Sequence, residues 1–72
     1  MEHLVFYVVR QRGGWGVEHG GVVKSGHKNR DSAIAVARDH IAKAAHRGHQ
    51  CHLRIQEEAG AWREERSFDP KH

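Results

Sequence analysis

The most apolar stretch of the chain runs from Leu4 to Val9 and consists of aliphatic, β-branched and aromatic residues. This composition favours a β-strand. Successive side chains of a strand point to opposite faces, and here both sets are apolar, so the pattern predicts a central strand that is at least partly covered on both sides. The glycines of the next turn, Gly13 and Gly14, predict a hairpin that pairs Arg10 with Trp15.

The two faces of this predicted hairpin differ in character. One face is apolar throughout, and we interpret it as the core face; it carries Leu4, Phe6, Val8, Trp15 and Val17. On the reverse face Val9 lies opposite Gly16 in this register. A glycine opposite a bulky residue either permits strand twist or leaves a shallow groove.

A polar, glycine-rich segment follows from Gly20 to Arg30, and it predicts an extension of the second strand, or a short third strand, and then a loop. Asn29 is a suitable N-cap for a helix that we expect from about Arg30 to Arg47, and Gly48 is a suitable stop. The apolar residues of this segment recur at helical spacing, which predicts a buried helix face of Ala33, Ile34, Ala37, Ile41, Ala44 and Ala45.

The segment from Gln50 to Gln56 alternates between apolar and polar residues, which predicts a half-buried strand with Cys51, Leu53 and Ile55 inward. A last strand is predicted from Ala61 to Phe68. A turn centred on Ala59 and Gly60 sets Glu65 opposite Arg54 and Arg63 opposite Gln56. We prefer this register because a shift by two residues sets Arg54 against Arg63, and like charges that face each other across a ladder are destabilising.

The predicted fold class is therefore α+β, with the element order ββαββ. We expect a two-layer sandwich of one helix on a four-stranded, mainly antiparallel sheet. Residues 1–68 form the single domain, and residues 69–72 form a frayed C-terminal tail.

One helix covers one face of such a sheet, so the other face is left open. The open face is predicted to carry apolar and basic side chains together, namely Val5, Tyr7, Val9, Arg54 and Arg63. An uncovered apolar patch usually marks a partner surface, and a homodimer or another protein partner is the leading interpretation.

Nucleic-acid binding is the alternative, because the excess of positive charge is concentrated in the first part of the chain. The 72-residue chain has a net charge of +3, with five basic and two acidic residues in 1–30 against seven of each in 31–72. Basic side chains bind phosphates and an exposed aromatic ring can stack on a base. The candidate residues are Arg10, Arg12, Trp15, Lys24, Lys28 and Arg30.

No catalytic residue, metal site or cofactor is predicted. His46, His49, Cys51 and His52 cluster in the sequence, but Cys51 and His52 are neighbours on a predicted strand and point to opposite faces. An inward-facing thiol is expected to be inert. The glycines at 13, 14 and 16 lie in a hairpin and not before a helix, so they do not form a phosphate-binding loop. We therefore expect a protein without enzymatic activity.

The lone cysteine and the short apolar runs indicate a cytoplasmic protein without a disulfide or a membrane span.

Three segments, GGWGV at 13–17, SAIAVAR at 32–38 and EERSFDP at 64–70, resemble a family of short bacterial proteins known only as a domain of unknown function. The chain departs from that pattern at Asn29, where the family has Ser or Thr, and in a longer helix end. The resemblance implies the same order of elements and a bacterial protein, and it implies no ligand.

Overall fold

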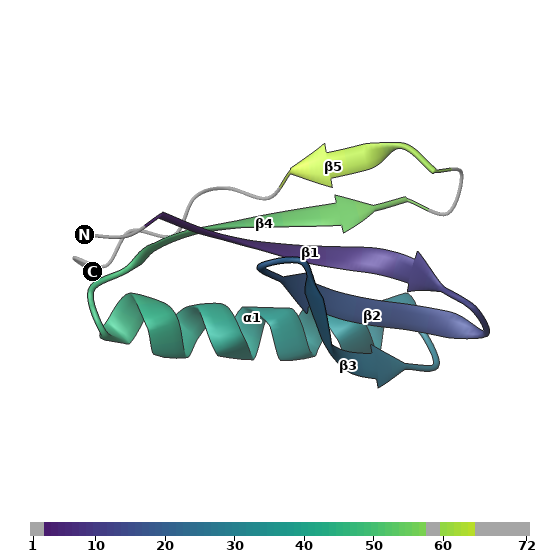
Figure 1. Ribbon diagram of the computed structural model, residues 1–72, viewed down its shortest axis with the longest axis horizontal. Coiled ribbons are helices and arrows are strands. Elements are labelled where there is room, and N and C mark those ends of the chain that lie inside the picture. The colour runs from purple at the N-terminus through teal and green to yellow at the C-terminus, as the bar shows by residue number, and fades with distance from the viewer. Residues whose placement is uncertain (1–2, 58–59, 65–72) are drawn as a thin grey trace.

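The structure, a computed structural model, describes residues 3–57 and 60–64, and these residues form one helix and one sheet (Figure 1). The elements are β1 (His3–Gln11), β2 (Gly14–His19), β3 (Val22–His27), α1 (Arg30–His46), β4 (Gln50–Gln56) and β5 (Trp62–Glu64). The strands are ordered β3-β2-β1-β4-β5 across the sheet, and α1 lies along one face. The α+β class is confirmed.

The first hairpin has the predicted register and β1 is the central strand, as predicted. Val8 pairs with Val17, and Arg10 pairs with Trp15. The sheet itself differs from the prediction in two ways, because 22–27 is a separate strand and because β4 runs parallel to β1. Helix α1 explains the parallel pair, since it is a crossover that carries the chain from the edge strand β3 to a position beside β1.

Helix α1 begins and ends where the sequence predicts. The Asn29 side chain accepts a hydrogen bond of 2.8 Å from the backbone N–H of Ser32, which satisfies an otherwise unpaired donor of the first turn. At the other end Gly48 adopts a φ of 98°, and the N–H groups of Gly48 and His49 donate to the carbonyls of Ala45 and Ala44. This is a Schellman motif, which requires a residue that tolerates positive φ.

The core lies between α1 and the sheet, and it consists of residues that the sequence places inward, whereas Ala45, also expected in the buried helix face, is only half-buried and lies outside it. The side chains that are fully or almost fully buried are Phe6, Val8, Trp15, Val17, Ala33, Ile34, Ala37, Ile41, Cys51, Leu53 and Ile55. Leu4 and Ala44 are only partly buried and pack against this cluster. Each large aliphatic side chain contributes about 1.5–3 kcal/mol when buried, so this cluster holds the helix on the sheet.

The predicted register of the last hairpin is wrong by one residue. Arg54 pairs with Glu64, and Gln56 pairs with Trp62. The turn sets this register, because the Gly60 N–H donates to the Glu57 carbonyl at 2.9 Å and Gly60 takes a φ of 97°. A shift of one residue exchanges the two faces of a strand. Residues 65–72, which include Glu65, the rest of the predicted strand and the predicted tail, lie outside the described residues.

Candidate functional site

One face of the sheet is covered by α1, and no element of the described residues covers the other (Figure 1). We call this second surface the open face. It is formed by the side chains that alternate with the core residues, together with the backbone of two glycines: His3, Val5, Tyr7, Val9, Gly16, Glu18, Val23, Gly26, His52, Arg54, Gln56 and Trp62. The predicted residues Val5, Tyr7, Val9 and Arg54 lie there together.

Opposite charges flank the centre of the open face. Tyr7 on β1 pairs with Glu18 on β2 and with Arg54 on β4, so its ring lies between an acidic and a basic side chain. Glu18 is half-buried and forms no ion pair with any described residue. Beyond Glu18, at the β3 edge, Val23 leaves 46% of its surface exposed. The open face is therefore apolar along β1, with the acidic Glu18 on its β2 side and the basic Arg54 on its β4 side.

A second set of paired residues crosses the strands of the open face, with glycines at its β3 end and Trp62 at its β5 end. Val9 pairs with Gly16 and Gly16 with Gly26, so the β2–β3 side of this set has no side chains of its own. A methyl group at Gly16 would lie 2.9 Å from the Gln11 side chain, whereas one at Gly26 would meet no atom within 4 Å. The space over Gly16 is therefore occupied by a neighbouring side chain, whereas no atom occupies the space over Gly26.

Trp62 forms the β5 end of this set. Its indole meets the ring of Tyr7 edge to face, with the centroids 5.9 Å apart and the planes at 81°, yet 52% of its surface stays exposed. Such a geometry is favourable for aromatic pairs. Trp62 was not expected on the open face, because the register predicted from the sequence places it on the helix side. Gly60, two residues before Trp62, is the signal in the sequence for the position of the turn.

Arg63, which the sequence predicts on the open face, lies on the helix side instead. It pairs with Ile55, a core residue, and its Nε is 3.4 Å from Glu57. The same carboxylate accepts a hydrogen bond of 2.8 Å from Arg30 at the start of α1. Glu57 thus links α1 to the β4–β5 hairpin, and Arg30 and Arg63 have a structural role.

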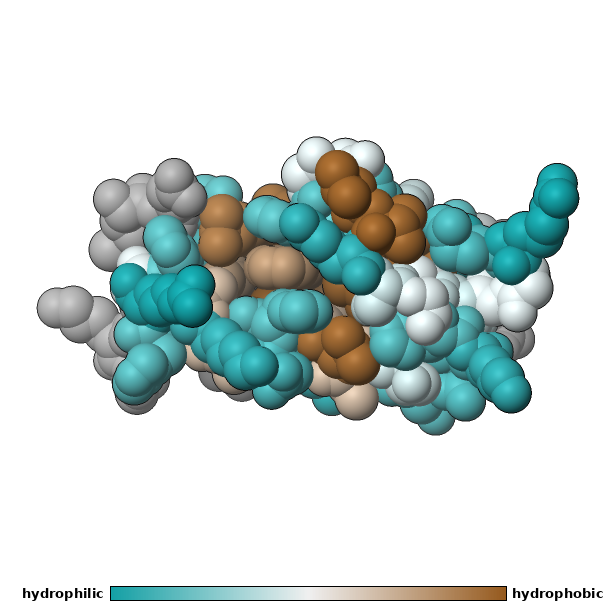
Figure 2. Space-filling model, turned by 60° about the horizontal axis from the view of Figure 1, so that its bottom comes forward, coloured by the Kyte–Doolittle hydropathy of each residue, from teal (hydrophilic) through white to brown (hydrophobic). Residues whose placement is uncertain are grey.

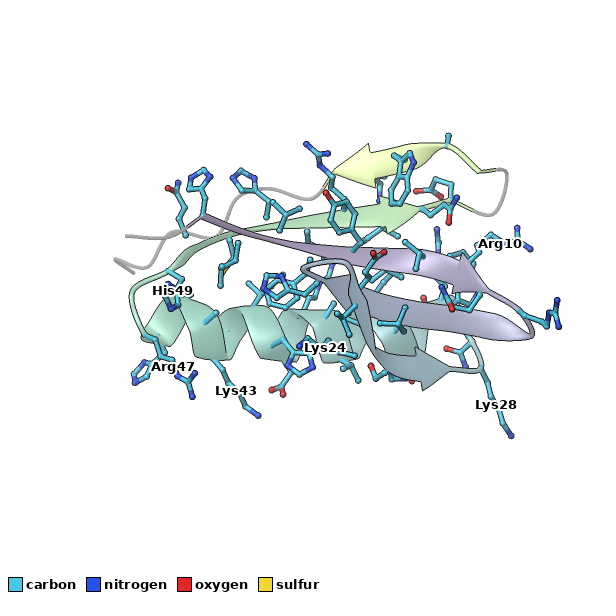
Figure 3. All side chains as sticks on the ribbon, in the orientation of Figure 1. Arg10, Lys24, Lys28, Lys43, Arg47 and His49 are labelled. Atoms are coloured by element: carbon cyan, nitrogen blue, oxygen red, sulfur yellow. The ribbon has the colours of Figure 1, made fainter. Side chains whose placement is uncertain are left out.

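The six residues proposed for nucleic acid do not form one surface. Trp15 is only 9% exposed, and the Arg10 guanidinium lies over its ring at 5.6 Å from the centroid. Arg30 is engaged by Glu57. Arg12 and Lys28 are exposed at the end of the sheet where the first hairpin turns, but Lys24 lies well away from Arg10 and Lys28 (Figure 3).

The histidines and the cysteine around the α1–β4 junction are divided between different surfaces. Cys51 is fully buried in the core, and burial raises the pKa of its thiol. His52 lies on the opposite face, where its ring is 5.1 Å from that of His3. Among the residues that the structure describes, no three His, Cys, Asp or Glu side chains are grouped as metal ligands would be.

The fold and the open face define a small α+β protein with a mixed sheet that is covered on one side. Residues 6–68 match the model of a family of uncharacterised proteins conserved in bacteria, DUF2188, and the chain belongs to that family. The resemblance found in the sequence is thereby confirmed. No curated protein and no solved structure matches the chain. Within the described part of the chain, α1 is neither long nor apolar enough to cross a bilayer.

Proposed function

We propose that this bacterial protein is a non-enzymatic interaction module whose open face binds a second copy of the chain. The observation that carries the proposal is the exposed Trp62, which lies against Tyr7 on a sheet face that no described element covers. Exposed apolar patches of this kind mark interaction sites more often than chance, and tryptophan and tyrosine are common anchors of interfaces. The cytoplasmic location stays a prediction from the sequence.

The charges of the open face support a two-fold partner in one orientation. A two-fold axis that runs along β1 exchanges the two sides of the sheet, because it turns the β2 side of one copy over the β4 side of the other. Glu18 of each copy then faces Arg54 of the other. A two-fold axis across the strands sets Glu18 against Glu18, and this arrangement is electrostatically unfavourable. An isologous interface needs such self-complementary pairs.

The shape of the open face supports the same orientation. The axis along β1 carries Trp62 of one copy over the β2–β3 side of the other, where Gly26 leaves space without a side chain. A bulky aromatic ring in a bare part of the facing sheet is the packing expected at the centre of an interface. Glu18, Gly26 and Trp62 are thus explained together.

The size of the open face sets the expected strength of the association. β1 has nine residues, and five strands of this spacing give a surface of about 30 by 20 Å, on the order of 600 Å². Standard interfaces bury about 800 Å² on each partner. We therefore expect a dimer that dissociates in the micromolar range and not an obligate one.

The test is the solution mass of the protein over a wide range of concentration. The mass is expected to rise from monomer to dimer, and Trp62→Ser is expected to shift this transition to higher concentration by about tenfold or more, since tryptophan anchors often contribute over 1.4 kcal/mol. The control variant is Arg12→Gln, which changes an exposed residue away from the open face. A monomer at all concentrations contradicts the proposal.

Nucleic-acid binding is the second candidate function, and the same measurement of solution mass tests it. The exposed basic residues near the first turn favour it, whereas the buried Trp15 does not. A short DNA duplex is added at low and at physiological salt. A complex that forms at low salt, and is lost in Arg12→Gln, supports the alternative, because phosphate contacts weaken steeply with salt. A dimer that ignores the duplex supports the first proposal.

A further inference from the structure

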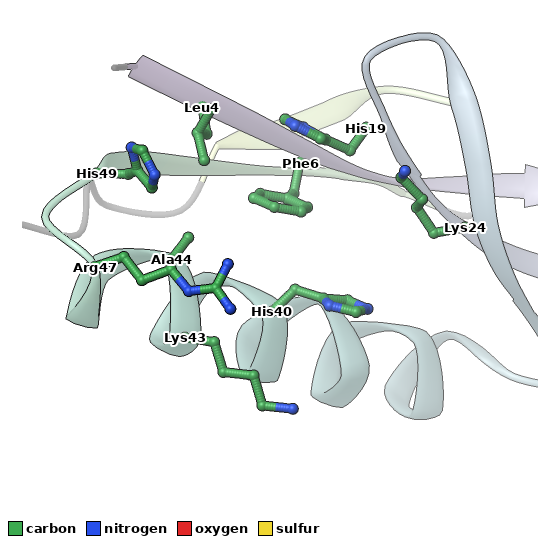
Figure 4. Close-up of a pocket in the computed structure, with 9 residues that line it drawn as sticks. All are labelled: Leu4, Phe6, His19, Lys24, His40, Lys43, Ala44, Arg47 and His49. Atoms are coloured by element: carbon green, nitrogen blue, oxygen red, sulfur yellow. The ribbon is translucent and has the colours of Figure 1, made fainter. Parts of the chain in front are cut away.

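A groove lies on the helix side of the molecule, away from the open face. It is bounded by the C-terminal half of α1, the start of β1, the end of β2 and the bulged part of β3, and it encloses about 410 Å³ (Figure 4). Figure 2, which looks at the helix side, shows apolar residues in a hollow between hydrophilic ones. A volume of this size is typical of a small-molecule site.

Among the described residues, every ionisable side chain that lines this groove is basic. They are Lys24, Lys43, Arg47, His19, His40 and His49. Lys43 forms a solvent-exposed ion pair of 3.2 Å with Asp39, one turn earlier on α1. Lys24 and Arg47 form no ion pair with any described residue. The groove therefore has an excess of positive charge that the described residues leave uncompensated.

The dipole of α1 explains only part of this positive charge. Basic residues in the last turn of a helix offset the negative end of its dipole, and this covers Lys43 and Arg47. Lys24 belongs to β3 and His49 follows the helix, so neither is explained in this way. Because the helix dipole opposes an anion at this end, an anion must be held by the side chains themselves.

A β-bulge directs Lys24 into the groove. Val17 pairs with Ser25 but the next residue, Glu18, pairs with Val23, so Lys24 is the extra residue of β3. Bulges re-aim side chains and are common beside functional sites. Here the bulge sets two consecutive residues toward the helix side. Ser25 hydrogen-bonds His27 at 2.8 Å, and Lys24 lines the groove.

The floor of the groove is apolar and partly aromatic. Phe6 lies between two imidazoles, with its ring centroid 4.4 Å from that of His19 and 6.2 Å from that of His40, and both pairs are nearly parallel. Leu4 and Ala44 complete the floor. An inorganic ion would leave these surfaces unused, whereas a ligand with a flat or apolar body and an anionic end would contact both parts.

We propose that this groove binds an organic phosphate, with the phosphoryl group held by Lys24, Lys43 and Arg47 and a flat or apolar body against Leu4, Ala44 and the edge of the His19–Phe6–His40 ring stack. The site is separate from the open face, and it stands whether or not the protein forms a dimer. Lysine and arginine are the usual partners of phosphate oxygens.

A hydrogen bond to the sheet backbone fixes His19 at the edge of the groove. Its Nδ1 lies 3.0 Å from the Val5 carbonyl oxygen, which can only accept, so Nδ1 is the donor of this bond. The imidazole therefore keeps its place beside Phe6 when a ligand binds.

The test is calorimetric titration with adenosine monophosphate, inorganic phosphate and adenosine as separate probes. The monophosphate is expected to bind more tightly than either of the others, because it alone uses both the cationic rim and the apolar floor. Lys24→Gln and Arg47→Gln are each expected to weaken it by about tenfold, the value of one charge-assisted contact. Lys28→Gln removes the same charge from an exposed residue outside the groove and is expected to change affinity less than about twofold.

Four outcomes overturn the proposal. One is the absence of monophosphate binding at millimolar concentration by a folded protein. A second is an equal loss in Lys24→Gln and Lys28→Gln, which would indicate a general charge effect. The third is inorganic phosphate binding as tightly as the monophosphate, which would remove the role of the Phe6 floor. A DNA duplex that binds through Lys24 and Arg47, when the monophosphate does not, would assign the groove to nucleic acid and also overturn it.

Discussion

The indole of Trp62 contacts the ring of Tyr7 edge to face, with the ring centroids 5.9 Å apart, although the two residues are 55 positions apart in the sequence. The contact joins the last described strand to the central one on the side that α1 leaves open. It fixes the exposed indole against the sheet, so a partner that binds there meets an ordered aromatic surface. Ordered aromatic side chains lose little conformational freedom on binding.

Two neighbouring valines provide a matched test of the open face. Val22 and Val23 are both well exposed on β3, but Val23 pairs with Glu18 on the open face and Val22 pairs with His19 on the helix side. We expect Val23→Asp to raise the dimer dissociation constant by about tenfold, and Val22→Asp to leave it unchanged, since only the first places a charge in the interface. Analytical ultracentrifugation measures both, and an equal effect of the two substitutions would rule out the open face.

Two glycines of the sheet are expected to respond very differently to alanine. A Cβ at Gly14 would overlap the backbone carbonyl oxygen of His27, whereas a Cβ at Gly26 would meet nothing within 4 Å. Neither has a positive φ, so the difference is steric alone. Gly14→Ala is expected to lower the free energy of unfolding by about 1–3 kcal/mol, and Gly26→Ala to change it by less than about 0.5 kcal/mol. Urea denaturation checks this, and similar midpoints for the two variants would contradict the close approach of β2 and the β3–α1 connection.

His27 holds β3 to the start of α1 through two serines. Its Nε2 is 2.8 Å from the Ser25 hydroxyl and its Nδ1 is 3.2 Å from the Ser32 hydroxyl. Both ring nitrogens are occupied, so we interpret the group as a structural link. His27→Ala is expected to cost about 1–2 kcal/mol of stability through two lost hydrogen bonds. His46→Ala, at the exposed last turn of α1, serves as the control, and thermal unfolding should separate the variants by several degrees.

Local signals were sufficient for most of the fold. The glycine turn set the β1–β2 register, and Asn29 and Gly48 set the ends of α1, because caps and turns act through neighbouring residues. The parallel pairing of β1 with β4 was not predictable in this way. It depends on where the helix carries the chain, and every apolar face of the sequence is equally satisfied if β4 lies at an edge.

Arg63 and Trp62 were assigned to the wrong faces for one reason, which is the register of the last hairpin. Charge pairing between Arg54 and the final strand can distinguish registers that differ by two residues, but a shift of one also sets an acidic residue of the sequence, Glu64, at the paired position. Only the geometry at Gly60 decides between them. The sequence therefore predicted Val5, Tyr7, Val9 and Arg54 correctly as neighbours, and exchanged Arg63 for Trp62. The basic groove was missed because its residues come from separate elements that only the folded chain brings together.

The buried thiol of Cys51 gives the protein a pH dependence at the alkaline end. Burial raises the pKa of this thiol above its ordinary value of 9.0, so the folded state disfavours the thiolate more than the unfolded state does. Below the ordinary pKa both states are protonated and the contribution to stability is fully present. It is lost as the pH rises through and above that value, because ionisation then stabilises the unfolded chain.

We therefore expect the free energy of unfolding to fall more between about pH 8 and about pH 10.5 in the native protein than in Cys51→Ala, which lacks the titrating group. Cys51→Ala starts from a lower stability because it leaves a small cavity beside Leu53 and Ile55, so the slopes and not the absolute values are compared. In the same range a thiol reagent should modify the native protein far more slowly than the urea-unfolded chain. Equal slopes and rapid modification of the folded protein would together show that Cys51 is accessible, and would contradict its place in the core.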